Sequence, residues 1–371
     1  MTFRRLVTTR NDTGRIAASI PKHRDGDHAE LGNRFDVEVV VTRVAASNSK
    51  QMTREKIMKA VRYHRYGNSD VLQYEETPRP VPGPGQVLVK VAATSFNPVD
   101  AGIRGGYLAE VYGIDFPHTP GVDVAGTIAE LGERVQGWSV GDAVVAFLPL
   151  DADGAAAEYA LAPAKSLAPA PRTVALADAA ALPEAGLTAW QSLFEIAGLT
   201  AGQTILINGA SGAVGGYAIQ LAKQAGAIVT ATAKPRDADR LRGYGADRIV
   251  DYIDYTHSPV IVDGAPFDVV LNLIGTTPEQ TEALIGIVAD GGFHVGTMVP
   301  GPENPGRAVR SQRVFVRSDA AQLAGLVGRV DAGQLRIEVA DRRPLEQAAA
   351  VHHDSDAGRL HGKTILLPAE Q

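Results

Sequence analysis

A stretch of small residues between two apolar runs has the composition to bind the phosphates of a ligand. It lies at residues 209–216, after the apolar run 205–207 and before apolar residues spaced as in a helix. Small side chains let backbone N–H groups approach a pyrophosphate, and the N-terminus of a helix favours negative charge. The spacing matches the G-x-G-x-x-G fingerprint of dinucleotide sites, with Ala210, Gly212 and Gly215 in the three glycine positions. The alternative is an ordinary turn between a strand and a helix that binds no ligand.

The residues expected to contact this dinucleotide lie on the turn and where neighbouring strands end. Ligands of parallel α/β sheets bind at the carboxyl ends of the strands. On the turn the expected contacts are Ala210, Ser211, Gly212, Ala213, Val214 and Gly215. At the ends of later strands they are Asn272, Gly275 and Thr297, which are expected near the nicotinamide ring.

The segment after the second strand indicates which dinucleotide binds. NAD sites usually have an Asp or Glu there, which accepts a hydrogen bond from the ribose 2′-hydroxyl. This chain has Thr232 instead, followed by Lys234 and Arg236. The missing carboxylate removes repulsion, and two cations can pair with a 2′-phosphate. NADPH is therefore the expected cofactor, and the alternative is that both cations are ordinary solvated charges.

The composition limits the other kinds of site. The chain contains no cysteine, which excludes disulfides, thiolate metal sites and cysteine nucleophiles. Its nine histidines show no metal-ligand spacing, and the adjacent His352 and His353 are expected at the surface because their segment is polar. No apolar run is long enough to span a bilayer, and no signal peptide is visible, so a cytoplasmic protein is expected.

The 371 residues divide into four parts by their sequence patterns. Residues 1–57 are poor in apolar residues, so we expect a mostly disordered leader with strand-like alternation only at 35–44; a transit peptide is the alternative. Residues 58–180 show short strands between Gly/Pro turns, which is typical of a barrel-like β unit. Residues 181–320 alternate strands with helices and predict a doubly wound parallel sheet, with its sixth strand at 314–317. Residues 321–371 contain strands expected at 335–340 and 363–367 that return to the β unit.

The charge is distributed unevenly between these parts. Residues 1–57 hold eleven Lys/Arg and seven Asp/Glu, a net charge of +4. Because the whole chain has a net charge of −6, the remaining residues carry a net charge of −10. Binding to nucleic acid needs clustered cations that neutralise phosphates. Nucleic acid is therefore not expected as a partner of the main part of the chain, and the leader is the only candidate basic patch.

Several motifs together resemble those of one family. They are NPVD at 97–100 with RGGY at 104–107, PGVDVAG at 120–126, Gly141-Asp142, the segment 205–227, LRGYGAD at 241–247 and GRLHGK at 358–363. Over residues 58–368 the chain resembles the medium-chain dehydrogenase/reductases, and within them the zinc-free quinone oxidoreductases related to zeta-crystallin. The resemblance implies an α/β fold with a GroES-like β-rich catalytic domain, a doubly wound Rossmann domain and a cleft between them. It also implies a homodimer.

The same resemblance implies roles for individual residues. Zinc-containing relatives have Cys where this chain has Asn97, and a His-Glu pair where it has Val122 and Asp123, so no metal is expected. Tyr107 matches the tyrosine that related enoyl reductases use or are proposed to use as a hydrogen-bond donor to the substrate. Asn97 is expected to orient the substrate carbonyl or the nicotinamide ribose, and Tyr252 to line the adenine side.

Alternatives remain for these residues and for the activity. Tyr107 can also be a packed core tyrosine, and Asp100 and Arg104 can form a structural ion pair. The expected activity is zinc-independent hydride transfer from NADPH to a quinone or an α,β-unsaturated carbonyl. A trans-2-enoyl thioester reductase is the second enzymatic hypothesis. The third is an NADPH-binding protein with a non-enzymic role such as RNA binding.

Overall fold

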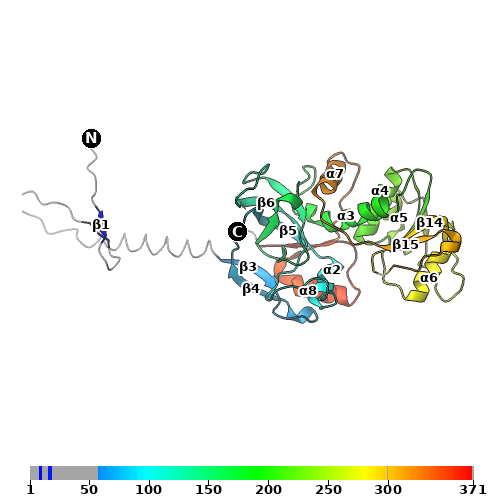
Figure 1. Ribbon diagram of the computed structural model, residues 1–371, viewed down its shortest axis with the longest axis horizontal. Helices are drawn as coiled ribbons and strands as arrows, with labels where there is room; N and C mark the ends of the chain where they lie inside the picture. Colours follow the sequence, from blue (N-terminus) through cyan, green and yellow to red (C-terminus); the bar gives the residue numbers. More distant parts are fainter. Residues whose placement is uncertain (1–7, 11–15, 19–56, 299, 370–371) are drawn as a thin grey trace, which may run out of the picture. The chain divides into compact units, whose positions relative to one another are not determined.

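The computed structural model describes residues 8–10, 16–18, 57–298 and 300–369 (Figure 1). The chain forms two units, residues 1–53 and 54–371. In the first unit, β1 (Thr8–Arg10) pairs antiparallel with β2 (Ile16–Ala18). The strand expected at 35–44 and most of the leader lie outside the described residues. No helix among the described residues is long and apolar enough to cross a membrane.

Six parallel strands form the sheet that carries the glycine-rich turn. In sheet order they are β12 (Arg248–Val250), β11 (Ile228–Thr232), β10 (Thr204–Asn208), β13 (Phe267–Asn272), β14 (Val288–Gly296) and β15 (Arg310–Arg313). The order reverses beside β10, as in a doubly wound sheet, and this confirms the predicted fold class. The helices α4 (Ala213–Gln224), α5 (Pro235–Tyr244) and α6 (Pro278–Gly286) connect successive strands.

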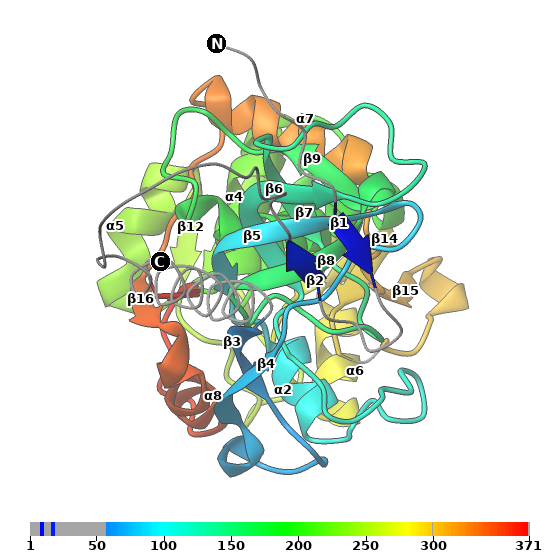
Figure 2. The same ribbon diagram turned by 90° about the vertical axis from the view of Figure 1, so that its left-hand side faces the viewer.

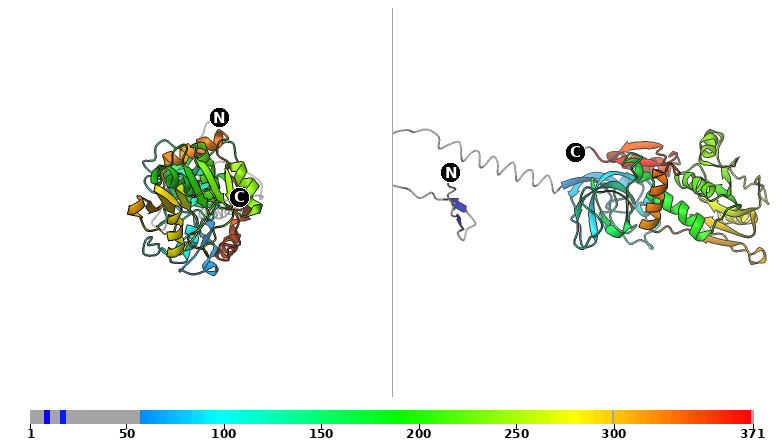
Figure 3. Two further views of the ribbon diagram at one scale, coloured as in Figure 1. Left: turned by 90° about the vertical axis from the view of Figure 1, so that its right-hand side faces the viewer. Right: turned by 90° about the horizontal axis from the view of Figure 1, so that it is seen from above.

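A second, mostly antiparallel sheet forms the β-rich part. Its main path is β16 (Asp341–Pro344), β17 (Thr364–Leu367), β5 (Gln86–Ser95), β6 (Asp123–Leu131), β7 (Ala143–Phe147) and β9 (Leu167–Pro169). Off this path, β8 (Tyr159–Pro163) pairs with β5, and β3 (Ile57–Arg62) pairs separately with β4 (Gln73–Pro78). Ile365 of β17 faces Ser95 of β5, so the end of the chain joins this sheet, as the red and cyan strands show (Figure 3).

The structure differs from the sequence-based expectations at two strands and one helix. The sixth strand of the parallel sheet is β15, four residues before the expected 314–317, because this edge strand consists of polar residues and gives no apolar signal. Residues 335–340 are irregular, and the strand β16 follows them. The helix α8 (Ala348–Asp356) was not predicted, since its apolar positions are few.

Of the two histidines expected at the surface, His353 is exposed, whereas His352 is buried within this helix. His352 is only 2% exposed, and its Nδ1 accepts a hydrogen bond of 2.9 Å from Arg104 of α2 (Pro98–Arg104). Burial, and secondarily the Arg104 charge, lower the pKa of His352 to about 3, so the ring is neutral. Arg104 also binds Asp356 at 2.8 Å. The Arg104 ion pair therefore joins α2 to α8 and does not involve Asp100.

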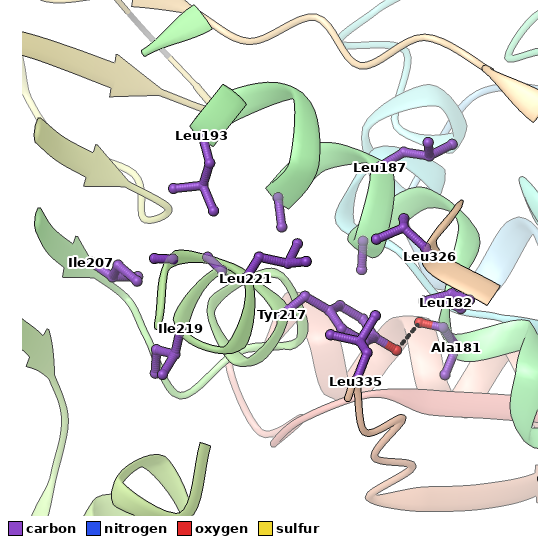
Figure 4. Close-up of a cluster of buried hydrophobic side chains, with 14 of the residues drawn as sticks. Ala181, Leu182, Leu187, Leu193, Ile207, Tyr217, Ile219, Leu221, Leu326 and Leu335 are labelled. Carbon is purple, nitrogen blue, oxygen red and sulfur yellow. Dashed lines mark hydrogen bonds between the residues drawn. The ribbon is translucent and has the colours of Figure 1, made fainter. Parts of the chain in front are cut away.

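An apolar cluster attaches the helix α3 (Pro183–Trp190) to the parallel sheet. Figure 4 shows Leu187 of α3, Leu221 of α4 and Leu326 of α7 (Ala320–Asp331) packed together. The hydroxyl of Tyr217 donates a 3.1 Å hydrogen bond to the carbonyl of Ala181, just before α3. On the other side α7 lies along β9 of the β-rich sheet (Figure 2). The cluster thus holds the two sheets in one compact unit and positions the start of α3.

Shortening a fully buried leucine of this cluster should destabilise the protein. We expect Leu187→Ala to lower the free energy of unfolding by about 2–5 kcal/mol, through lost burial and the cavity that remains. Val140→Ala is the control, because Val140 is exposed and its loss should change stability by no more than about 0.5 kcal/mol. Urea unfolding followed by circular dichroism measures both, and equal midpoints would contradict the role of the cluster.

Candidate active site

The glycine-rich turn is shaped to receive an anion. Gly209 has a φ of +87°, which favours glycine, and a side chain at Gly215 would place its Cβ 2.5 Å from the carbonyl oxygen of Ala210. Among the described residues no side chain caps the N-terminus of α4, which begins after Gly212. The first N–H groups of this helix therefore lack a side-chain partner and suit a pyrophosphate.

Thr232 supports this turn from within the protein. Its side chain is 1% exposed, and its hydroxyl accepts a 2.9 Å hydrogen bond from the N–H of Gly209 and donates a 3.1 Å bond to Asn208. Its hydroxyl is thus used inside the turn, and the expectation that Thr232 belongs to the cofactor-binding residues stays a prediction.

An amide network joins the carboxyl ends of three parallel strands. Asn208 of β10 donates to Asn272 of β13 at 2.9 Å, and the N–H of Thr297 donates to the Asn272 carbonyl at 3.1 Å. The Asn272 amide then donates to Thr276 at 3.2 Å. Asn272 is buried, whereas Gly275 is exposed beside it. The predicted strand-end residues therefore do lie together, and Asn208, which the sequence reasoning missed, connects them.

The residues expected to bind a 2′-phosphate lie at the end of β11 and the start of α5. Lys234 and Arg236 are both exposed, and the Lys234 ammonium lies 5.4 Å from the ring centre of Tyr252. An acid that no sequence pattern indicated, Asp237, lies next to these cations. Asp237 accepts a 3.0 Å hydrogen bond from the Ser211 hydroxyl and another from Arg240 at 3.1 Å. Its negative charge is thus partly neutralised by Arg240 next to the turn.

A buried polar cluster lies where α2 begins. Asp123 is fully buried, and its Oδ2 accepts hydrogen bonds from Asn97 at 2.8 Å and from the Ser95 hydroxyl. The ammonium of Lys363, 5% exposed, donates to the Asn97 side-chain oxygen, to the Phe96 carbonyl at 3.2 Å and to Asp123 at 3.4 Å. Both ends of the Asn97 amide are used inside this cluster. Asn97 therefore positions other residues of the cluster, whereas the sequence predicted that it contacts the substrate or the cofactor.

The same cluster does not fit a zinc ion. Asn97 and Asp123 stand at positions where zinc-containing relatives have ligands, but here they are hydrogen-bonded to each other, and the Lys363 ammonium contacts both. A fixed cation at this place repels a second one, and an amide with one carboxylate is not a tetrahedral N/S ligand set. No group of three His, Cys, Asp or Glu suited to a metal ion occurs within the part of the chain that the structure describes.

Two further acids border this cluster. Asp100 accepts hydrogen bonds from the backbone N–H groups of Asn97 at 2.8 Å and Gly121 at 3.0 Å. Burial raises the pKa of Asp100 to about 7, and these two hydrogen bonds oppose the shift. Glu184, at the start of α3, donates its backbone N–H to Asp123 at 2.8 Å. The sequence reasoning did not select Glu184 or Lys363, although Lys363 ends a motif that carried the family resemblance.

Tyr107, the expected catalytic tyrosine, lies on the surface. It follows α2 and is 87% exposed, so the alternative of a packed core tyrosine is wrong. Its role toward a substrate stays a prediction.

Comparisons with known proteins identify the family. The family model of the alcohol dehydrogenase GroES-like domain matches residues 83–172, and that of the zinc-binding dehydrogenases matches residues 244–366. A chloroplast envelope quinone oxidoreductase homolog of Arabidopsis thaliana is 34% identical over 333 residues, which cover 84% of this chain and 99% of that protein. The chain belongs to the quinone oxidoreductase branch of the medium-chain dehydrogenase/reductases.

Solved structures agree with this place in the medium-chain family. The quinone oxidoreductase from Coxiella burnetii has a TM-score of 0.76 and 29% identity, over 84% of this chain and 99% of that one. A mycobacterial protein complexed with NADPH has a TM-score of 0.72 and 27% identity, over 84% and 100%. This member of the family is accordingly a nicotinamide-dependent oxidoreductase. The Arabidopsis relative is a chloroplast protein, and the cytoplasmic location expected here stays a prediction.

Removing the buried ammonium should destabilise the protein strongly. We expect Lys363→Met to lower the free energy of unfolding by about 3–5 kcal/mol, because Asp123 keeps a buried charge without its cation. The control is Lys223→Met, which removes an ion pair with Asp247 whose side chains are both partly exposed, and which should cost no more than about 1 kcal/mol. Denaturant unfolding measures both variants, and similar losses would show that the buried pair is dispensable.

Proposed function

We propose that this protein reduces quinones or α,β-unsaturated carbonyl compounds with hydride from NADPH and without zinc. The observation that carries the proposal is the Lys363 ammonium in contact with both Asn97 and Asp123, at the positions where zinc-containing relatives have metal ligands. Zinc in alcohol dehydrogenation polarises the oxygen that loses its proton. A conjugated carbonyl needs less polarisation, since hydride adds to a carbon already made electrophilic by conjugation.

The cofactor-binding part of the proposal assigns the pyrophosphate to the uncapped N-terminus of α4 and the glycine-rich turn. Lys234 and Arg236 would pair with the 2′-phosphate, and Tyr252 would line the adenine side. Asn272, Gly275 and Thr297 would border the nicotinamide at the carboxyl ends of β13 and β14. The bound nicotinamide supplies the hydride, and the protein supplies its position.

The substrate side of the proposal keeps Tyr107 and gives Asn97 a new role. The carbonyl oxygen gains negative charge as hydride arrives and needs a hydrogen-bond donor. The exposed hydroxyl of Tyr107 is free to act as that donor. Asn97 instead positions Asp123 and Lys363 through both ends of its amide. A homodimer, as the family resemblance implies, remains part of the proposal.

A substrate screen tests the activity. Protein beginning at Met58 is mixed with NADPH and a quinone, an enone or a trans-2-enoyl thioester, and NADPH oxidation is followed by absorbance. We expect turnover of quinones or enones that is unchanged by a chelator or by added zinc. Preference for the thioester would favour the second enzymatic hypothesis. Absence of turnover, together with RNA binding by the full chain that is lost when residues 1–57 are deleted, would replace the proposal with a binding function.

The cofactor preference is tested by removing both cations near the predicted 2′-phosphate. We expect Lys234→Ala combined with Arg236→Ala to raise the dissociation constant of NADPH by about 10–100-fold, the loss of one or two charge-assisted hydrogen bonds. The constant for NADH should change by less than about 3-fold, since NADH lacks the phosphate. Fluorescence titration of each reduced cofactor measures both constants.

Arg242→Ala is the matched control for this experiment. Arg242 is an exposed cation on the same helix that pairs with Asp239 at 3.0 Å, as Arg236 lies 3.8 Å from Asp237. The Arg242→Ala variant should leave the dissociation constants of NADPH and NADH unchanged. An equal weakening of NADPH and NADH by the double variant would contradict the assignment of the 2′-phosphate.

A further inference from the structure

The proposed reduction needs a proton as well as a hydride. Hydride addition to an enone or a quinone leaves an anion that must be protonated, and a positioned acid accelerates this step. Most ionisable groups of the polar cluster are enclosed: Asp123, Asp100 and Lys363 are all buried. Glu184 is the exception, because it borders the cluster and is partly exposed.

The geometry of Glu184 leaves one of its oxygens available. Its backbone N–H is fixed on Asp123, and its Oε1 accepts a 3.2 Å hydrogen bond from the Thr188 hydroxyl one turn later in α3. Oε2 has no hydrogen-bond partner among the described residues, and no cationic side chain among them lies within ion-pair distance. The carboxyl group is therefore anchored at one end and open at the other.

The charged groups around Glu184 come from three elements. Lys363 precedes β17, Asp123 begins β6, and Asp100 belongs to α2. Burial raises the pKa of Glu184 to about 7; Lys363 opposes this shift, while Asp123 and Asp100 add to it. The helices α4 and α7 also pack on α3. They present apolar side chains such as Leu221 and Leu326 to this helix.

The other acids of the cluster have no open oxygen. Asp100 accepts three backbone N–H groups, those of Asn97, Gly121 and Val122. One oxygen of Asp123, Oδ2, accepts hydrogen bonds from side chains such as that of Asn97. The other, Oδ1, accepts a hydrogen bond from the backbone N–H of Glu184. All of these bonds favour the ionised carboxylate and hold it inside the protein. Neither group is placed to release a proton to a substrate.

Hydrogen bonds connect α3 and Asp123 to the segment that follows β15. The helix continues into a π-helical turn in which Gln191 donates a 2.9 Å hydrogen bond to the carbonyl of Arg317, after β15. The next residue, Ser318, donates to the carbonyl of Phe147 at 2.9 Å, and Phe147 pairs with Asp123 across β6 and β7. Asp123 and the start of α3 are thus linked to the segment that leaves the carboxyl edge of the parallel sheet, the edge at which we expect the nicotinamide ring to bind.

We propose that Glu184 donates the proton that completes the reduction, and that Asp123 and Lys363 are positioning residues for it; this rests on the proposed function. Hydride from the reduced nicotinamide forms a C–H bond at the β-carbon of an enone, and the π electrons move to the carbonyl oxygen. The O–H bond of Glu184 then breaks, and its proton goes to the enolate. The nicotinamide is oxidised, the substrate is reduced by two electrons, and Glu184 regains a proton from water.

The test compares Glu184→Gln with wild type in NADPH-dependent reduction of an enone. We expect kcat at pH 7 to fall about 100-fold, the usual contribution of a general acid, while the dissociation constant of NADPH changes by less than 2-fold. Wild-type kcat should decrease as pH rises through about 7, because the acid must be protonated. The variant should lose this limb of the profile, a change that a purely structural role would not produce.

Glu282→Gln is the matched control, since Glu282 is an exposed glutamate on the helix α6. It should keep the activity and the pH profile of wild type. An infrared titration of the carboxyl C=O band, taken as the difference between wild type and Glu184→Gln, measures the protonation of Glu184 without turnover.

The outcomes separate two failures. An active wild type with an equally active Glu184→Gln variant would overturn the proton donor and leave the proposed function standing. A Glu184 carboxyl that is already ionised at pH 6 in the infrared titration would overturn the donor as well. A wild type that oxidises NADPH with none of the substrates would overturn the proposed function and this step with it.

Discussion

The buried pair of Asp123 and Lys363 is the interaction on which the site depends. A charge removed from water is stable only if partners replace its hydration. Here those partners come from five places in the chain: the end of β5, the cap of α2, the start of β6, the first turn of α3 and the residue before β17. Satisfying the two charges therefore fixes how these elements meet, and the fixed elements in turn position Glu184.

Polar groups of the glycine-rich turn also need hydrogen-bond partners, and here the partners are neutral. Gly209 takes a backbone conformation that its neighbours stabilise through the Thr232 hydroxyl, and Asn208 continues the hydrogen bonds to Asn272. Because these polar groups satisfy one another, the first N–H groups of α4 are left for a ligand. Binding then needs little rearrangement of the protein, which favours affinity for an anion.

The two parts have complementary functions in the proposed reaction. The parallel sheet presents a site for the phosphates and the nicotinamide, and the β-rich part contributes the cluster around Asp123. An ammonium group in place of a metal supplies positive charge but no open coordination position. The reduction of conjugated carbonyl compounds that we propose needs no such position, and it is compatible with membership in the quinone oxidoreductase branch.

Local patterns in the sequence determined the parts of this structure that depend on neighbouring residues. Apolar periodicity and the small residues at 209–216 predicted the parallel sheet, the turn and α4, because strand burial and close backbone approach leave a local signature. The polar edge strand β15 and the buried His352 left none. Lys363 and Asp123 are 240 residues apart, and nothing near either one shows that they meet. Only the tertiary structure decided that Asn97 is enclosed, that Tyr107 is exposed and that Glu184 has one open oxygen, since burial and hydration are properties of the packed chain.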